Sequence, residues 1–195
     1  MRLVYMGTPD IARVCLQRLH ERGFEIAAGS TKPDTPKNRG MKLAQSPVKE
    51  YALSVGLPVV QPQRFRDDAV VEELRALAPD LIVVVAYGKI LPQRVLDIPK
   101  LGCINMHASI LPELRGAGPV QWSILKHCDE TGISAMYLTA GMDEGDVIEI
   151  RKPPIEPMET SEELMARLAD IAAELACDTV RAIENGTAQR TPQDN

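Results

Sequence analysis

The chain alternates between short apolar runs and longer segments in which apolar residues recur at helical spacing. The clearest run, LIVVVA at Leu81–Ala86, contains no polar residue, which is typical of a strand covered on both faces in a parallel sheet. Ser161–Ala182 has apolar residues three or four positions apart and two glutamates directly after Ser161, which predicts an amphipathic helix. These two segments set the pattern for the rest of the chain.

Strands and helices are predicted to follow one another along most of the sequence. Strands are expected at Arg2–Met6, Phe24–Ala28, Leu57–Val60, Leu81–Ala86, Leu101–Met106, Ile133–Leu138 and Val147–Arg151. Helices are expected at Asp10–Arg22, with Thr8 as N-cap, from Ser46 to about Gly56, at Asp67–Leu77 and at Ser161–Ala182. Residues 31–45 are polar and are expected to form a loop. This order predicts an α/β fold with an open, mostly parallel twisted sheet and helices on both faces.

Length and composition narrow the class of protein. A chain of 195 residues fits one domain, and 45% apolar with 25% charged residues is typical of a globular protein. No apolar run approaches the roughly 20 residues that span a bilayer. The start, MRLVYMG, lacks the features of a signal peptide, so we expect a cytoplasmic protein with no membrane partner. The four cysteines and three histidines show no metal-ligand spacing, which predicts reduced cysteines and no metal site.

A polar face is predicted at the end of the fifth strand. Along an extended chain, Asn105, His107 and Ser109 point to one face, whereas Ile104 and Met106 point to the other. Ligands of open α/β sheets bind beyond the carboxyl ends of the strands. A single amide or imidazole at this place could simply cap the following loop, but the pair favours a functional site.

Two further segments follow predicted strands. Gly141–Asp146, GMDEGD, is typical of an acidic turn between two antiparallel strands, and a calcium loop is a weaker alternative because the run lacks the alternating oxygen ligands of an EF-hand loop. Ala86–Pro92, AYGKILP, either connects a strand to a helix or forms a pocket wall whose backbone groups bind a flat heterocycle.

The segment NMHASILPELRGAGPVQW, which begins at Asn105, resembles the signature N-x-H-x-S-L-L-P-x-x-R-G-x-x-P of the folate-dependent formyltransferases, with Ile110 in place of the first leucine. GMDEGD resembles the aspartate loop of that family, and the separation from His107 to Asp143 also matches. The similarity covers essentially the whole chain. It implies a Rossmann-like catalytic domain that transfers a formyl group from 10-formyltetrahydrofolate to an amine without a metal.

The resemblance also implies roles for individual residues. Asn105 is expected to donate a hydrogen bond to the formyl oxygen as that oxygen becomes negatively charged, His107 to bind the same oxygen or move protons, and Asp143 to orient His107. The folate is expected to lie against two segments, namely Tyr87, Gly88, Ile90, Leu91 and Pro92, and Ser109, Ile110, Leu111 and Pro112.

The first turn of the chain bears on the amine acceptor. Family members that formylate glycinamide ribonucleotide hold its phosphate with a glycine- and serine-rich loop, where this chain has Gly7-Thr8-Pro9-Asp10. Pro9 lacks a backbone donor and Asp10 repels a phosphate at a helix N-terminus, which argues against that acceptor. The start MGTPDIA and residues 31–45 instead resemble the methionyl-tRNA formyltransferases, a group within the family.

In that group a basic insertion engages the acceptor arm of initiator tRNA. Arg39 falls at the arginine of the group's R-G-x-K pattern, so the resemblance implies that Arg39, Lys37 and Lys42 contact initiator methionyl-tRNA. A solvated surface loop is the alternative for this segment. The net charge of −5 is a poor match for a protein that binds nucleic acid electrostatically.

Residues 1–186 are expected to form the catalytic domain, and residues 187–195 to begin a linker to a basic OB-like domain that those enzymes carry. We expect a monomer that binds folate and has a weak, salt-sensitive affinity for tRNA. Four alternatives stay open: sugar-nucleotide N-formylation, glycinamide ribonucleotide formylation, formyltetrahydrofolate hydrolysis, and binding of folate or RNA without catalysis.

Overall fold

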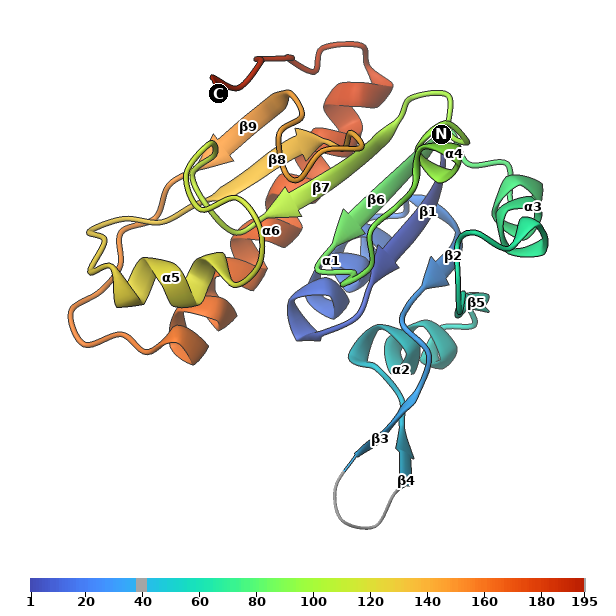
Figure 1. Ribbon diagram of the computed structural model, residues 1–195, viewed down its shortest axis with the longest axis horizontal. Coiled ribbons are helices and arrows are strands. Elements are labelled where there is room, and N and C mark those ends of the chain that lie inside the picture. Colours follow the sequence, from blue (N-terminus) through green and yellow to red (C-terminus); the bar gives the residue numbers. More distant parts are fainter. Residues whose placement is uncertain (38–41, 195) are drawn as a thin grey trace.

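The computed structural model of the protein describes residues 1–37 and 42–194. Its centre is a seven-stranded sheet in the order β5-β2-β1-β6-β7-β8-β9 (Figure 1). The strands are β1 (Arg2–Gly7), β2 (Glu25–Ser30), β5 (Val59–Val60), β6 (Leu81–Val85), β7 (Cys103–His107), β8 (Ile133–Tyr137) and β9 (Val147–Arg151). Neighbours from β5 to β7 are parallel, whereas β7–β8 and β8–β9 are antiparallel. The predicted mostly parallel α/β sheet is confirmed.

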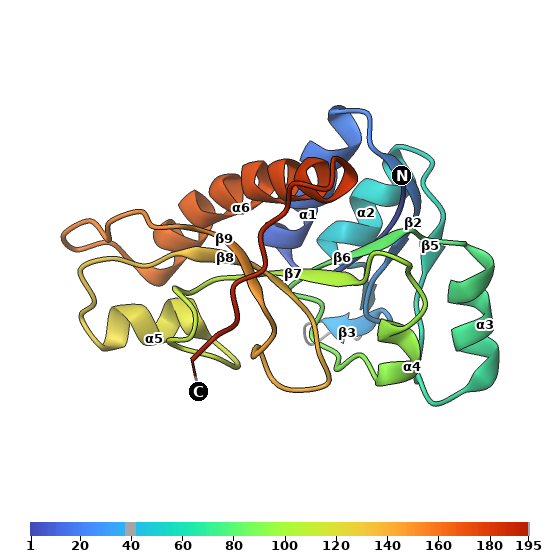
Figure 2. The ribbon, with the colours of Figure 1, turned by 90° about the horizontal axis from the view of Figure 1, so that it is seen from above.

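Helices lie on both faces of this sheet (Figure 2). They are α1 (Asp10–Glu21), α2 (Pro47–Ser54), α3 (Asp68–Ala76), α4 (Gln93–Leu96), α5 (Pro119–Leu125) and α6 (Ser161–Glu184). Helices α1, α2 and α6 contribute to the core on one face, and α3 and α4 contribute to the core on the other. Helix α6 begins with the capping box of Thr160 and Glu163, which satisfies backbone donors of its first turn.

Strand β6 shows why the central strands lack polar residues. Leu81, Val83 and Val85 belong to the core beneath α1 and α6, whereas Ile82 and Val84 belong to the core beneath α3 and α4. Successive side chains of a strand point to opposite faces, so a strand with helices on both sides is apolar at every position. The run LIVVV was predicted on this ground.

Two expectations about local structure are wrong. Thr8 does not cap α1, because Pro9 occupies the N-cap and the Thr8 hydroxyl donates to the carbonyl oxygen of Tyr87 at 3.0 Å. Residues 31–45 are not only loop, because β3 (Thr35–Lys37) and β4 (Lys42–Ala44) pair as an antiparallel hairpin that projects from the body of the protein (Figure 1). Leu43 is 68% exposed, so the described part of the hairpin buries no large apolar side chain that would mark it in the sequence. Helices α4 and α5 were not predicted.

Several chemical properties of the described residues complete the picture. Cys15, Cys103 and Cys177 are free and buried, as expected, and burial raises the pKa of the Cys103 thiol to about 12. Over residues 1–37 and 42–194, no helix is long and apolar enough to cross a bilayer. The same residues contain no group of three or more His, Cys, Asp or Glu side chains that could hold a metal ion.

Candidate functional site

A cavity of about 710 Å³ lies at the carboxyl ends of β6 and β7. Its walls are formed by residues 84–91, 105–108, 116–121 and 138–143, with Ile11, Leu96 and Met165. This volume is within the range of cavities that hold a cofactor-sized molecule, and the position is the one where open α/β sheets bind ligands. The loops after β7 and β8 both contribute to the cavity, although β8 is antiparallel to β7 and ends beside the start of that strand.

Asn105, His107 and Asp143 all line this cavity. The Nε2 atom of His107 lies 2.9 Å from the carbonyl oxygen of Leu114, and its Nδ1 atom lies 3.6 Å from Oδ2 of Asp143. The same Oδ2 accepts a hydrogen bond from the backbone N–H of Gly116 at 2.8 Å. The structure therefore brings the three predicted catalytic residues together, although Asn105 and His107 come from β7 and Asp143 from the loop between β8 and β9.

The contacts of His107 fix where it can exchange a proton. A carbonyl oxygen only accepts hydrogen bonds, so Nε2 carries the hydrogen that it donates to Leu114. In the neutral ring, Nδ1 then holds the free lone pair, and this atom is the one nearest to Asp143. A proton that reaches Nδ1 lies against a carboxylate, which suits a general base.

The backbone around these residues adopts uncommon conformations. Asp143 has a φ of 50°, and Leu114 has a φ of 53°. Left-handed backbone is unfavourable for residues other than glycine and is often found at functional sites. Here each of the two residues makes a hydrogen bond beside the predicted catalytic residues, Leu114 with His107 and Asp143 with Gly116.

The predicted folate residues fall into two groups. Tyr87, Gly88, Ile90 and Leu91 line the cavity. Tyr87 is buried, which raises the pKa of its hydroxyl, and that hydroxyl lies 3.0 Å from Oγ of Ser30. The structure does not place the other predicted residues in the cavity wall, and these are Pro92, Ser109, Ile110, Leu111 and Pro112.

Several residues of this second group build the loop after β7. The Ser109 hydroxyl donates to the carbonyl oxygen of Glu113 at 2.6 Å. Buried Ser134 on β8 donates to the carbonyl oxygen of Ser109 at 2.6 Å and accepts from the N–H of Leu111 at 3.1 Å. These bonds fix the loop that carries Leu114, the hydrogen-bond partner of His107.

Two segments of the cavity wall offer free backbone groups. Within the described part of the chain, the backbone groups of residues 89–91 and 140–142 make no hydrogen bond to other protein groups. Polar backbone groups that border a cavity must bind water or a ligand. A flat heterocycle with donors and acceptors on its edges fits such walls.

Sequence reasoning missed part of the site. Residues 116–121 and 138–140 line the cavity, as do Ile11 and Met165 from α1 and α6. The rule that ligands lie beyond the carboxyl ends of parallel strands does not reach residues 138–140, because β8 is antiparallel and ends beside the start of β7. No local signal marks Ile11 or Met165, because each also belongs to an ordinary amphipathic helix.

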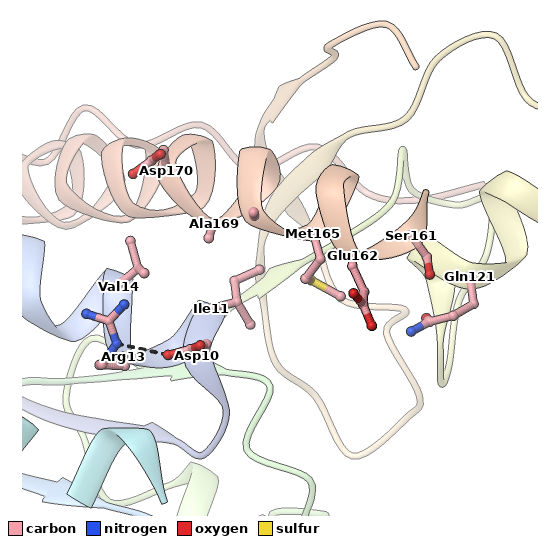
Figure 3. Close-up of a pocket in the computed structure, with 11 residues that line it drawn as sticks. Asp10, Ile11, Arg13, Val14, Gln121, Ser161, Glu162, Met165, Ala169 and Asp170 are labelled. Atoms are coloured by element: carbon pink, nitrogen blue, oxygen red, sulfur yellow. Dashed lines mark hydrogen bonds and ion pairs between the residues drawn. The ribbon is translucent and has the colours of Figure 1, made fainter. Parts of the chain in front are cut away.

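A second cavity of about 380 Å³ lies between α1, α5 and α6 (Figure 3). Ile11, Gln121 and Met165 line both cavities, so the two adjoin each other. Asp10 and Arg13 form an ion pair at 3.0 Å on one side of it. The arrangement extends the first cavity toward the N-terminal ends of α1 and α6.

Two of the predicted tRNA-binding residues, Lys37 and Lys42, belong to the β3–β4 hairpin. Lys37 and Lys42 pair through their backbones at the tip end of the two strands, and Arg39 lies outside the described residues. The base of the hairpin is fixed to α2, because Asp34 pairs with Lys49 at 2.6 Å. Gln61 donates to Asp34 at 2.9 Å and adds a link to the end of β5.

Known proteins resemble the chain in sequence and in fold. It is 46% identical over 195 residues to a methionyl-tRNA formyltransferase of Clostridioides difficile, covering 100% of this chain and 63% of the relative. It is 48% identical to the methionyl-tRNA formyltransferase of Geobacter sulfurreducens, covering 100% of this chain and 62% of that protein. The chain thus spans less than two thirds of these curated relatives.

A solved structure supports the fold independently. Glycinamide ribonucleotide transformylase 1 from Symbiobacterium toebii superposes with a TM-score of 0.82 at 19% identity, covering 98% of this chain and 94% of that one. At this identity the likeness concerns the fold alone. Residues 1–180 match the formyl transferase family across nearly the whole described fold, and the chain belongs to that family.

Proposed function

We propose that the 710 Å³ cavity is the site at which the formyl group of 10-formyltetrahydrofolate passes to the free amine of initiator methionyl-tRNA. The observation that carries the proposal is the meeting of Asn105, His107 and Asp143 along this cavity. The identities of 46% and 48% to curated methionyl-tRNA formyltransferases support the choice of acceptor.

The proposed reaction needs an oxyanion donor and a proton carrier. The acceptor nitrogen bonds to the formyl carbon, the formyl oxygen gains a negative charge, and the bond from that carbon to the folate nitrogen then breaks. The amide of Asn105 makes no hydrogen bond to other described residues and so is free to donate to this oxygen. A donor of this kind accelerates such reactions by on the order of 10²–10³.

A proton moves from the acceptor amine to the folate nitrogen during this transfer. The amine loses a proton as the tetrahedral intermediate forms, and Nδ1 of His107 takes it beside the carboxylate of Asp143. The same proton then reaches the departing folate nitrogen, which leaves as a neutral amine. Because Nε2 is hydrogen-bonded to the carbonyl oxygen of Leu114, the imidazole ring of His107 cannot turn without losing that hydrogen bond.

The cavity suits a folate on physical grounds. Its volume accommodates a molecule of this size, and its free backbone groups at 89–91 and 140–142 match the polar edges of a pterin. Tyr87, Gly88, Ile90 and Leu91 are the assigned wall on one side. Ile90 is 84% exposed, so a ligand at the cavity mouth covers an otherwise solvated apolar side chain.

The projecting hairpin supports a nucleic-acid acceptor. Strands β3 and β4 project from the globular body, while Asp34 and Lys49 fix the base of their hairpin (Figure 1). Lys37, Arg39 and Lys42 are assigned to phosphate contacts, which makes binding of the tRNA fall steeply with salt. The acidic balance of the whole chain, a net charge of −5, leaves the rest of the surface without a comparable attraction.

One set of assays tests this function. The protein is incubated with 10-formyltetrahydrofolate and, in separate reactions, initiator methionyl-tRNA, glycinamide ribonucleotide, an amino sugar nucleotide, or no acceptor. Formylation of the methionyl-tRNA alone is expected, with His107→Ala as the inactive control. Transfer to another acceptor, or formate release without one, assigns the site to that reaction instead. Folate binding without any turnover assigns it to a binding module.

A further inference from the structure

The side chain of Gln193 connects the loop that carries Asp143 to the loop that follows β7. Its Nε2 donates to the carbonyl oxygen of Asp143 at 2.8 Å and to that of Gly145 at 2.7 Å. Its Oε1 accepts from Arg115, with Nε at 3.1 Å and Nη2 at 2.9 Å. We propose that Gln193 is a positioning residue for formyl transfer, which holds the Asp143 carboxylate beside His107; this inference rests on the proposed function.

The chemistry of the amide group fits this role closely. An amide nitrogen has two hydrogens and its oxygen has two lone pairs, and each of the four finds a partner at Gln193. A glutamate could still accept from Arg115. It would, however, set a carboxylate oxygen against the carbonyl oxygens of Asp143 and Gly145, and it would offer no hydrogen to either.

The geometry forms a closed set of contacts around Asp143. Gln193 binds the backbone of Asp143 and the side chain of Arg115, and the next residue, Gly116, donates its N–H to the Asp143 carboxylate at 2.8 Å. The backbone and the carboxylate of Asp143 are therefore tied to the same neighbouring loop. His107 is tied to that loop as well, through Leu114.

Asp143 needs such support because its own backbone is unfavourable. It has a φ of 50°, a conformation that residues other than glycine seldom adopt. Two positions later, Gly145 passes so close to the carbonyl oxygen of Tyr137 that a Cβ atom would overlap it. The far end of the turn is thus fixed by β8, and Gln193 fixes the end at Asp143.

The distance in sequence makes the contact informative. Gln193 lies 50 residues after Asp143 and 78 residues after Arg115, beyond the end of α6. Thr191 pairs with Val147 on β9 and brings this segment to the loop. The proton-handling geometry of the site therefore depends on a residue outside the formyltransferase signature motifs.

Three variants of the full chain test the proposal. Gln193→Ala removes every contact, Gln193→Glu removes only the donated ones, and Gln189→Ala is the matched control, because Gln189 is exposed in the same segment and makes no hydrogen bond to other described residues. We expect kcat to fall at least about tenfold in both Gln193 variants, since small misplacements of catalytic groups cost up to roughly 100-fold. KM for folate and for tRNA should change less than about twofold, and Gln189→Ala should match the wild type.

A second background separates positioning from general stability. In Asp143→Asn, Gln193→Ala should lower kcat by less than about twofold more, because a residue that acts through Asp143 has nothing left to position. A kcat for Gln193→Ala within about twofold of the wild type overturns the proposal. So does an equal, additive loss in the Asp143→Asn background.

An independent measurement covers the case in which the wild type transfers no formyl group to methionyl-tRNA. That result refutes the proposed function but leaves the contact testable by amide hydrogen exchange. Residues 139–146 should exchange faster in Gln193→Ala than in Gln189→Ala, with α6 unchanged. Equal exchange of residues 139–146 in the two variants overturns the role of Gln193.

Discussion

Ser134→Ala removes one buried hydroxyl on which the loop after β7 depends. That hydroxyl donates to the carbonyl oxygen of Ser109 at 2.6 Å and accepts from the N–H of Leu111 at 3.1 Å. Ser134 has no exposed surface, so water cannot replace the hydroxyl without a change in the surrounding structure. The substitution therefore leaves a backbone donor and a backbone acceptor buried without partners.

The cost follows from these two groups. A buried polar group that loses its hydrogen bond costs about 1–3 kcal/mol, so two groups with partial relaxation give a loss of roughly 3 kcal/mol in the free energy of unfolding. For a protein of this length, each kcal/mol lowers Tm by roughly 2–4 °C. We expect Ser134→Ala to lower Tm by about 6–12 °C.

The assay is urea unfolding followed by far-UV circular dichroism, in which the midpoint should fall while the slope with denaturant stays the same. Thr179→Val is the matched control, because Thr179 is equally buried but its hydroxyl has no hydrogen-bond partner among the described residues. Replacing an unpaired hydroxyl by a methyl group should leave stability unchanged or raise it slightly. A loss for Ser134→Ala below about 1 kcal/mol, or no larger than that for Thr179→Val, would refute this reasoning.

Three further outcomes are expected. His107→Ala and Asp143→Asn should each lower kcat by on the order of 10² or more with unchanged circular dichroism, and near wild-type turnover in either would contradict their roles. Arg39→Ala should raise KM for methionyl-tRNA, by a larger factor at low salt than at high salt because one phosphate contact is lost, while an equilibrium titration shows unchanged folate binding. The hydrogen bond from Lys49 lowers the pKa of Asp34, so the pair stabilises the fold above the unfolded pKa of about 4, and that contribution is lost as pH falls through the lowered pKa. Unfolding measured from pH 2 to 6 should show the stability gap between wild type and Asp34→Asn closing toward low pH.

The parts of the fold that the sequence predicts are those in which burial and local pattern agree. Strand β6 and helix α6 were predicted closely because each packs along its whole length against the core, which fixes an apolar period. The β3–β4 hairpin was missed because strand pairing uses backbone groups, and no side chain of the described part of the hairpin needs to be buried. Helix α5 was missed because it is short and because its N-cap is Gly118, with a φ of 68°. A glycine has no side chain that could cap the helix, so the sequence shows no helix start there.

The candidate site divides in a similar way. Asn105 and His107 could be found because both end a strand on the same face, and Asp143 because its loop resembles a known motif. Met165 and Gln193 could not be found, because their roles depend on contacts between segments that are far apart in the chain. The local sequence indicates the chemistry of a residue, but the fold determines which distant residues contact it.

The pairing of Thr191 with Val147 has a bearing on self-association. Strand β9 is an edge of the main sheet, and an edge strand with free N–H and C=O groups can pair with another molecule. Here the N–H of Val147 donates to Thr191 at 2.8 Å, and the N–H of Thr191 donates back at 2.9 Å. Glu149 and Arg151 place charges along the remainder of the strand. The segment after α6 therefore occupies backbone groups of the edge strand β9 that could otherwise pair with another molecule. This limits edge-to-edge aggregation at that side of the sheet.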